Sequence, residues 1–393
     1  MHELSMDLTA VLRHAVAAGA SDVHFKVGQP PVLRSDGELA PATEFPVLGD
    51  ADVEAVLDRV TVAVPRRREL FDSTGDLDVA YSEPGLPRFR VNGFRQRGAI
   101  SFAFRVIPDQ IAGFSDLHLP AGVGRLADEQ RGLVLVTGAT GSGKTTTLAA
   151  MLDHINRTRR QHIVTVEDPI EVLHRDRSCI VNQREVGLDT ESFDQALRRV
   201  LRQDPDVILI GELRDAETAQ VALQAAESGH LVFSTLHTLD AAETISRMVE
   251  FFAPEKQAQV ISIMAGVLRG VVSQRLLPEL GGGRVPAVEV MVTNARIAEL
   301  IRERRTDEIP DAIADGEFFD MQTFSKALIE LVLGGNVDRE TAANAASNRH
   351  DFEIALARAE KAAIVTAANA AASGVVVERP KDDGLPTLRV AGA

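Results

Sequence analysis

The sequence is poor in cysteine, in aromatic residues and in long apolar runs, and each shortage excludes a class of protein. Cys179 is the only cysteine in 393 residues, so neither an internal disulfide framework nor a four-cysteine zinc site can form. The longest apolar run, 260–268, is far shorter than the roughly 20 residues of a membrane-spanning helix. Because residues 1–4 carry no basic, apolar leader, we expect no signal peptide, no direct membrane insertion and a cytoplasmic protein.

Positive charge is also scarce. The chain has 42 basic and 57 acidic residues, a net charge of −15, and its longest basic block is Arg66–Arg68. Aromatic residues make up 4% of the sequence, and we find no segment of basic and aromatic residues suited to binding a nucleic-acid strand. The composition therefore argues against nucleic acid as a partner, while the apolar fraction of 45% is enough for well-packed domains.

The pattern of apolar residues indicates two folded domains and a helical C-terminal region. Helical spacing in the first 18 residues, followed by strand-like runs, predicts a small α+β domain over 1–107. Segment 108–116 has no periodicity and is interpreted as a linker. We expect an α/β core over 117–293, helices over 294–362 and a tail over 363–393 that begins with a helix fragment and is otherwise disordered.

Individual elements can be placed by residue range. In the first domain we expect strands at 22–27, 31–34, 77–81, 88–94 and 99–107. Two helices are expected between them, at 50–60 and 65–71. In the second, apolar strands at 133–136, 162–166, 207–210 and 231–236 alternate with helices at 144–156, 192–202 and 216–228. Such continuous runs are typical of a mostly parallel sheet, whose ligand site lies outside the carboxyl ends of its strands. A hairpin tip is expected at 281–283, and later helices at 294–304, 323–333, 338–346 and 350–362.

A glycine-rich turn follows the first strand of the second domain. It lies between an apolar strand and a helix, which is the context of a phosphate-binding P-loop. The glycines let successive backbone N–H groups point into one concavity, and the helix N-terminus adds its positive end. We expect Lys144 to reach the β- and γ-phosphates of ATP and to be needed for catalysis, and Thr145 to hold Mg²⁺. The expected nucleotide-binding residues are Gly138, Ala139, Thr140, Gly141, Ser142, Gly143, Lys144, Thr145 and Thr146.

Carboxylates follow two of the apolar strands, at ends that should face the nucleotide. Glu167, Asp168 and Glu171 follow the second strand, and Glu212 follows the third. Carboxylates at these positions can hold Mg²⁺ or take a proton from an attacking water. We expect Glu167, Asp168 and Glu212 on the metal side. Glu171 is favoured as the group that activates water, with Glu212 as the alternative.

Two histidines, His230 and His237, bracket the strand at 231–236. An imidazole beside the γ-phosphate would report whether that phosphate is present, so both are candidate sensors, and His237 a candidate catalytic residue. The alternative is a packed, hydrogen-bonded histidine. No third ligand falls at metal-site spacing.

The first domain offers arginines for the same chemistry. Arg88 and Arg90 share one face of an expected strand, because alternate residues of a strand point the same way, and Arg105 lies on the next strand. We expect these arginines to act in trans on the phosphates of a neighbouring subunit, where they would stabilise charge in the transition state. A solvated strand face is the alternative interpretation.

These motifs, in this order, resemble those of the ring ATPases of type II and type IV secretion, most closely the branch that retracts type IV pili. The resemblance covers about residues 3–360. The matching segments are 19–24 (Gly-Ala-Ser-Asp-Val-His), 88–92 (Arg-Phe-Arg-Val-Asn), the P-loop, 167–171, 211–215, the two histidines, 273–278 (Ser-Gln-Arg-Leu-Leu-Pro), 321–324 and 335–352.

The resemblance implies a PAS-like N-terminal domain, a RecA-like P-loop domain and a homo-hexamer that binds ATP and Mg²⁺ between domains. It also implies an inner-membrane pilus platform protein as partner, so that the motor sits at the inner face of the membrane. The implied roles are phosphate and Mg²⁺ binding for Lys144 and Thr145, water activation for Glu171 or Glu212, phosphate sensing for His230 and His237, and completion of the site by the N-terminal arginines.

Two departures from family patterns bear on the branch. Assembly and secretion relatives usually carry a four-cysteine zinc module and a further N-terminal domain, and the absence of both favours retraction. The retraction branch usually has Ala-Ile-Arg-Asn-Leu-Ile-Arg-Glu near position 300; here Leu300–Glu303 match, but Ala298 and Glu299 replace its arginine and asparagine. An accessory pilus motor, an assembly or type II secretion ATPase, a weakly hydrolysing scaffold and a nucleic-acid translocase remain as alternatives.

Overall fold

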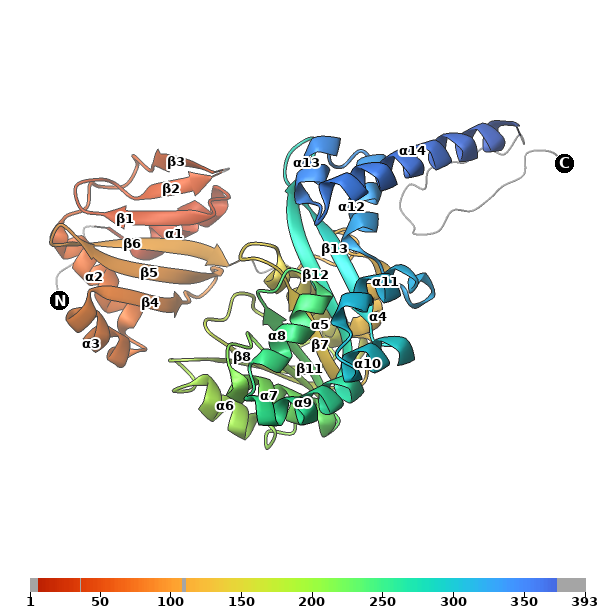
Figure 1. The fold of residues 1–393 in the computed structure, drawn as a ribbon. Helices are drawn as coiled ribbons and strands as arrows, with labels where there is room; N and C mark the ends of the chain where they lie inside the picture. Colours follow the sequence, from red (N-terminus) through yellow and green to blue (C-terminus); the bar gives the residue numbers. More distant parts are fainter. Residues whose placement is uncertain (1–5, 36, 108–110, 373–393) are drawn as a thin grey trace.

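The computed structural model describes residues 6–35, 37–107 and 111–372, with side chains up to 365. Figure 1 shows an N-terminal lobe beside a larger lobe that carries the P-loop, and a long C-terminal helix projecting from the latter. Residues 108–110 of the expected linker and 373–393 of the expected tail lie outside the described residues. The helix fragment expected at the start of that tail is present at 363–372, where helix α14 ends at Ala372.

The N-terminal lobe is an antiparallel sheet with helices against it. Its elements are α1 (Leu8–Ala17), β1 (Asp22–Lys26), β2 (Val32–Ser35), β3 (Glu38–Pro41), α2 (Asp50–Thr61), α3 (Pro65–Thr74), β4 (Asp76–Tyr81), β5 (Arg88–Gln96) and β6 (Ala99–Ile107). The strand order is β3-β2-β1-β6-β5-β4. The expected strands and helices of this lobe are confirmed; β3 is additional, and its four exposed residues give no alternation from which to predict it.

A cluster of aromatic rings lies in the core of this lobe. Phe104 makes edge-to-face contacts with Phe25, Tyr81, Phe89 and Phe102, with ring centroids 5.0–6.3 Å apart. These rings come from β1, β4, β5 and β6, and the residues that alternate with them point to the opposite face of the sheet. That face is mostly polar and includes Asp22, Asp78, Arg90 and Arg105. That polar face carries the arginines that approach the P-loop.

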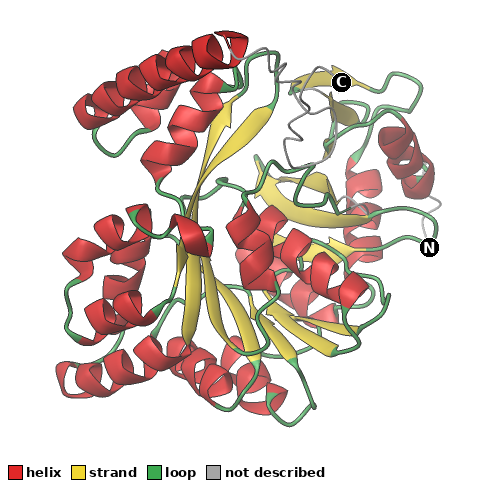
Figure 2. Ribbon diagram, turned by 90° about the vertical axis from the view of Figure 1, so that its right-hand side faces the viewer, coloured by secondary structure: helices red, strands yellow, loops and turns green. Residues whose placement is uncertain are grey.

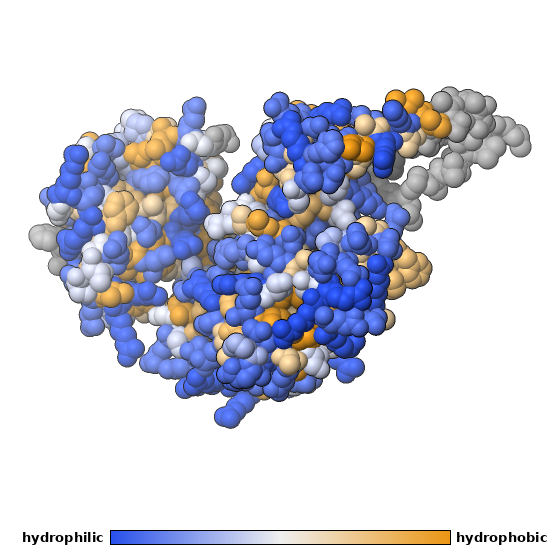
Figure 3. All heavy atoms as spheres, viewed as in Figure 1, coloured by the Kyte–Doolittle hydropathy of each residue, from blue (hydrophilic) through white to orange (hydrophobic). Residues whose placement is uncertain are grey.

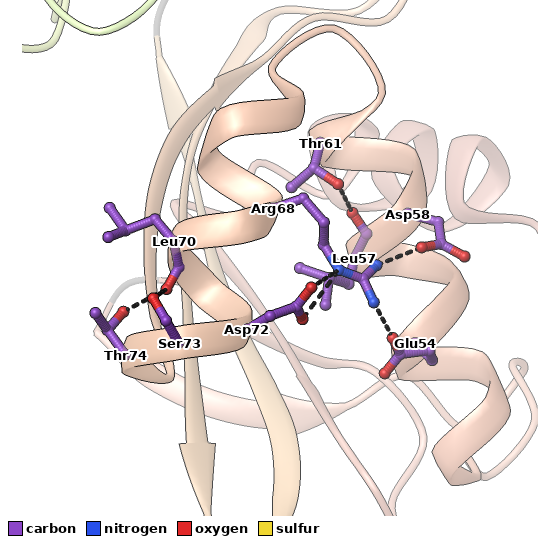
Figure 4. A network of polar contacts seen from close by, with 9 residues as sticks. All are labelled: Glu54, Leu57, Asp58, Thr61, Arg68, Leu70, Asp72, Ser73 and Thr74. Atoms are coloured by element: carbon purple, nitrogen blue, oxygen red, sulfur yellow. Dashed lines mark hydrogen bonds and ion pairs between the residues drawn. The ribbon is translucent and has the colours of Figure 1, made fainter.

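Helices α2 and α3 are joined by a charged cluster around Arg68 (Figure 4). The guanidinium donates to Glu54 over 2.5 Å, to Asp72 over 3.2 Å and to Asp58. Glu54 and Asp58 of α2 tie that helix to Arg68 of α3, and Asp72 of α3 steadies the arginine from its own helix. The arginine is partly exposed, so solvent limits each contribution to stability to about 1 kcal/mol at most.

The larger lobe is built on a mostly parallel sheet of order β13-β12-β7-β11-β10-β8-β9, in which β13 is antiparallel to β12. Helices cover both of its faces (Figure 2). The elements are α4 (Ala121–Ala127), β7 (Gly132–Thr137), α5 (Lys144–Thr158), β8 (His162–Glu167), β9 (Ile180–Glu185), α6 (Phe193–Val200), β10 (Val207–Ile210), α7 (Ala216–Glu227), β11 (Leu231–Leu236), α8 (Ala241–Glu250), α9 (Pro254–Val267), β12 (Leu268–Pro278) and β13 (Arg284–Val292).

Burial explains this arrangement. Strands β7, β10 and β11 are buried along their whole length, as expected for parallel strands covered by helices on both sides. The four predicted strands and the hairpin at 281–283 are confirmed, and β9, α4, α8 and α9 are additional. Since the parallel strands share one direction, their carboxyl ends, and the residues that follow them, meet at one edge of the sheet.

The C-terminal elements form two groups. They are α10 (Ala295–Arg302), η1 (Thr306–Glu308), α11 (Ile309–Ala314), η2 (Glu317–Phe319), α12 (Phe324–Leu333), α13 (Arg339–Ala345) and α14 (Arg349–Ala372). Helices α10 and α11 contact α8 and α9, whereas α12–α14 pack on the far end of the β12–β13 hairpin around Phe324, Leu328 and Phe352. The four expected helices are confirmed. In the view of Figure 3 this region and the N-terminal lobe stand apart, both with largely hydrophilic surfaces.

Candidate nucleotide site

The glycine-rich turn has the backbone of a phosphate-binding loop. It connects β7 to α5, and Gly138, Gly141 and Gly143 have φ values of +140°, +78° and +91°. At Gly138 a Cβ atom would lie 2.4 Å from the carbonyl oxygen of Gln274, so only glycine fits there. Gly143 caps α5 without a side-chain hydrogen bond, which leaves the helix N-terminus directed at the loop.

Lys144 and Ser142 supply polar groups inside this loop. The ammonium group of Lys144 donates to the carbonyl oxygens of Gly138 and Ala139 over 2.7 and 3.1 Å. Partial burial lowers the pKa of Lys144, while the carboxylates of Glu212 and Glu171 raise it. The hydroxyl oxygen of Ser142 is buried without a hydrogen-bond partner in the described part of the chain. A buried hydroxyl and a row of helix N–H groups suit an anionic ligand, so these residues fit a nucleotide phosphate.

A cleft of about 670 Å³ opens beside the loop, between the two lobes. Its walls bring together residues from the P-loop, from the ends of β8 and β10, from the end of β11 and from the N-terminal lobe. The expected site residues among them are Thr140, Gly141, Gly143, Lys144, Thr145, Thr146, Glu167, Asp168, Glu171, Glu212, His237, Arg90 and Arg105. Gly138, Ala139, Ser142, Arg88 and His230 do not line it.

Two carboxylates at the strand ends have different surroundings. Glu167 is buried, and it accepts hydrogen bonds from the Thr165 hydroxyl over 2.6 Å and the Gln183 amide over 3.1 Å. Burial raises the pKa of Glu167. Glu171, four residues further on, is exposed at the cleft and lies 4.0 Å from Arg90. Glu171 is therefore free to meet a ligand, whereas Glu167 is held within the protein.

Glu212 lies between the side chains of His237 and Arg214 at the end of β10. One of its oxygens is 3.1 Å from His237 Nε2 and the other accepts from Arg214 over 3.0 Å. His237 follows β11, which is adjacent to β10, so both residues reach the same edge of the sheet as the P-loop. The described residues contain no group of three or more histidine, cysteine or acidic side chains arranged to hold a metal by themselves. Mg²⁺ is usually held by substrate phosphates and one or two protein oxygens, and Thr145 and Glu212 fit that role.

The N-terminal arginines take two kinds of position in the structure, and their expected action in trans stays a prediction about the assembled ring. Arg90 and Arg105 line the cleft of their own chain, because the polar face of the N-terminal sheet is turned toward it. Each is also paired within its own lobe, Arg90 with Asp78 over 2.9 Å and Arg105 with Asp22 over 2.9 Å. Arg88 points instead into the contact between lobes, where it is 2.6 Å from Glu185.

His230 is the second expected residue that does not reach the site. It precedes β11, and its carbonyl accepts from Gly132 at the start of β7, which is the amino edge of the sheet. The P-loop and His237 lie at the carboxyl edge, about 20 Å away for a strand of six residues. The ring of His230 bonds locally to Ala225 and Ser228, so within one chain it cannot contact the phosphate bound by the P-loop.

Other residues around the cleft had no signal in the sequence. His174 lines it with a largely buried ring, and burial lowers the pKa of His174 to about 4. Gln183 joins the acidic segment to β9 by its bonds to Glu167 and Val172. Both residues follow the acidic segment at distances that match no motif. The pairing of β8 with β9 places Gln183, and the Gln183 side chain in turn accepts a hydrogen bond from the backbone N–H of His174 over 2.8 Å.

The comparisons with known proteins agree with this geometry. Residues 112–362 match the family described as type II/IV secretion system protein. The chain is 44% identical to the type IV pilus retractation ATPase PilT of Pseudomonas aeruginosa, over 88% of this chain and all of that protein. It is 38% identical to the type IV pilus ATPase PilU of the same organism, over 89% of this chain and 91% of PilU. The chain therefore belongs to the type II/IV secretion ATPase family.

Solved structures point to the same relatives. The crystal structure of the pilus retraction motor PilT with bound ADP superposes with a TM-score of 0.82 at 42% identity, covering 88% of this chain and 99% of that one. The ATPase DotB of Legionella pneumophila gives a TM-score of 0.69 at 28% identity, over 85% and 94% of the two chains. In the part of the chain that the structure describes, every helix is too short or too polar to cross a bilayer.

Proposed function

We propose that this chain hydrolyses ATP as a subunit of a ring-shaped motor that powers the retraction of type IV pili. The observation that carries the proposal is the cleft in which the P-loop, the acidic segment, Glu212 and the N-terminal arginines converge, in a chain that is similar to PilT over 88% of its length. The lobes correspond to a PAS-like domain over 1–107 and a RecA-like domain over 117–293, with 108–116 between them. The motor is a homo-hexamer that acts from the cytoplasm on a platform protein in the inner membrane.

The residues divide the chemistry among themselves. The P-loop amides and Lys144 bind the phosphates, and Thr145 and Glu212 hold Mg²⁺, with Asp168 beside them. When bound, the metal neutralises charge on the β- and γ-phosphates. Glu171 orients the attacking water and takes its proton as the terminal phosphate is transferred to that water. Arg90 and Arg105 stabilise the negative charge that spreads over the phosphate oxygens, and His237 holds Glu212 in place.

A count of surface pili tests the direction of the motor. Deletion of the gene in its host should leave cells with more pili and no twitching. A plasmid copy of the gene should return the pilus number to normal and restore twitching, whereas a copy that carries Lys144→Ala should do neither. Loss of pili on deletion would mean an assembly motor and would overturn the proposal.

An accessory motor of the PilU kind is the second candidate, and it is favoured by one observation. Ala298 and Glu299 in α10 replace the arginine and asparagine expected in the retraction branch. An accessory motor would leave pilus number unchanged on deletion and would weaken retraction only under load.

A further inference from the structure

A buried ion pair joins the two lobes beside the cleft. Nη2 of Arg88, at the start of β5, lies 2.6 Å from Oε2 of Glu185, at the end of β9. The two side chains are only 11% and 6% exposed. A buried carboxylate is costly unless it is paired. Because the partner of Glu185 is on the other lobe, its pairing depends on the position of the N-terminal lobe.

The same carboxylate oxygen holds the acidic segment. Oε2 of Glu185 also accepts a hydrogen bond from the backbone N–H of Ile170, over 3.1 Å. Ile170 is buried and immediately precedes Glu171. Glu185 is therefore bonded at once to the N-terminal lobe and to the residue next to the proposed water-activating group.

A second buried carboxylate holds the following amide. Glu167 is paired in register with Glu185 across β8 and β9, and it receives a hydrogen bond from the backbone of Glu171. Successive amides of the acidic segment are thus fixed by two carboxylates on adjacent strands. Glu167 is bonded to Thr165 and Gln183 within its own lobe, whereas Glu185 is bonded to Arg88 of the other lobe.

The electrostatics give this link a direction. Burial raises the pKa of Glu185, while Arg88 and the Ile170 hydrogen bond lower it. When Arg88 moves away, the buried carboxylate is left without its ion-pair partner, which is costly, so Glu185 turns from its position and its hydrogen bond to the Ile170 N–H is lost. Nε of Arg88 has no hydrogen-bond partner among the described residues, so the guanidinium itself is held mainly by Glu185.

We propose that Glu185 is a positioning residue that transmits the docking of the N-terminal lobe to Glu171. Arg88 holds Glu185, Glu185 holds the N–H of Ile170, and Glu171 is thereby placed for hydrolysis when the lobes are closed. Arg88 thus affects turnover without touching the nucleotide. The inference rests on the proposed function, in which Glu171 acts on water.

The test is a double-mutant cycle in the full chain with Arg88→Met, Glu185→Gln and both together. Arg66→Met is the matched control, since Arg66 lies on the same lobe contact, 3.7 Å from Glu191, with 86% and 66% of the two side chains exposed. We measure kcat and KM for ATP, and hydrogen exchange of the Ile170 amide without nucleotide.

Each single variant should lower kcat by about ten- to a hundredfold, the effect of a misplaced catalytic group, with KM changed by less than about threefold. The double variant should be no slower than the slower single variant, exchange at Ile170 should quicken in Arg88→Met, and Arg66→Met should match the wild type.

Three results would overturn the inference: additive losses in the double variant, a raised KM with unchanged kcat, or unchanged exchange at Ile170. Additive losses would mean that Arg88 acts on the nucleotide independently of Glu185. A wild type without ATP hydrolysis would refute the proposed function instead, and exchange at Ile170 would still decide whether the Arg88–Glu185–Ile170 link exists.

Discussion

Replacing Gly138 by alanine should destabilise the P-loop, and two features of the structure set the size of the effect. The new Cβ would lie 2.4 Å from the backbone oxygen of Gln274 and 2.6 Å from Oγ of Ser142, and backbone atoms cannot give way as a side chain can. The φ of +140° is also one that alanine rarely adopts. Strain of about 1–3 kcal/mol and crowding of about 1–3 kcal/mol together predict a loss of about 2–6 kcal/mol.

Gly141→Ala is the matched control for this change. Gly141 also has a positive φ, +78°, but nothing lies within 4 Å of its Cβ position. It should cost only the left-handed strain of about 1–2 kcal/mol. Urea denaturation of both variants, followed by titration with a fluorescent ATP analogue, checks the difference. If Gly138→Ala were as stable as Gly141→Ala and bound the analogue normally, the close approach of the loop to Gln274 would be wrong.

Three further predictions concern other parts of the chain. Glu171→Gln and Glu212→Gln should each bind ATP but lose turnover, as phosphate release will show, and near-normal turnover in both would remove their assigned roles. Burial raises the pKa of Glu289 from 4.5 to about 7, so the contribution of this group to folding stability should be fully present below about pH 4.5 and lost, by about 3 kcal/mol, as the pH rises through 7. Glu289→Gln should remove this part of the pH dependence in urea titrations. Leu300→Ala, at a side chain 4% exposed, should cost about 2–5 kcal/mol, whereas Arg302→Ala should keep stability and ATPase activity but fail to retract pili in a motility assay.

Periodicity predicted most of the architecture because the relevant signals are local. The continuous apolar runs at 133–136 and 207–210 form strands buried on both faces, and the alternation at 99–107 forms β6. The glycine pattern at 138–143 identified the phosphate loop, since positive φ values require it. Short exposed elements such as β3 carry no such pattern and were missed.

The site was harder to predict because its members come from distant segments. Glu185 and Arg88 are 97 residues apart in the sequence and lie on different lobes. The position of His230 can be predicted from the sequence by a simple argument. Residues at the two ends of a strand lie at opposite edges of the sheet, so one of the two histidines must lie far from the P-loop. Which cleft the arginines reach depends on the orientation of the N-terminal lobe, and no local sequence pattern predicts that orientation.

The account requires the P-loop and the arginines of one chain to complete one site, and mixing two inactive chains tests this. Lys144→Ala chains lack the phosphate-binding lysine, and Arg90→Met chains lack an arginine of the opposite wall of the cleft. Phosphate release from ATP is measured for each variant alone and for mixed rings formed from both. The account predicts that mixed rings hydrolyse no faster than the separate variants, because no chain holds both residues. Recovery of hydrolysis in the mixture would show that Arg90 serves a neighbouring subunit and would contradict it.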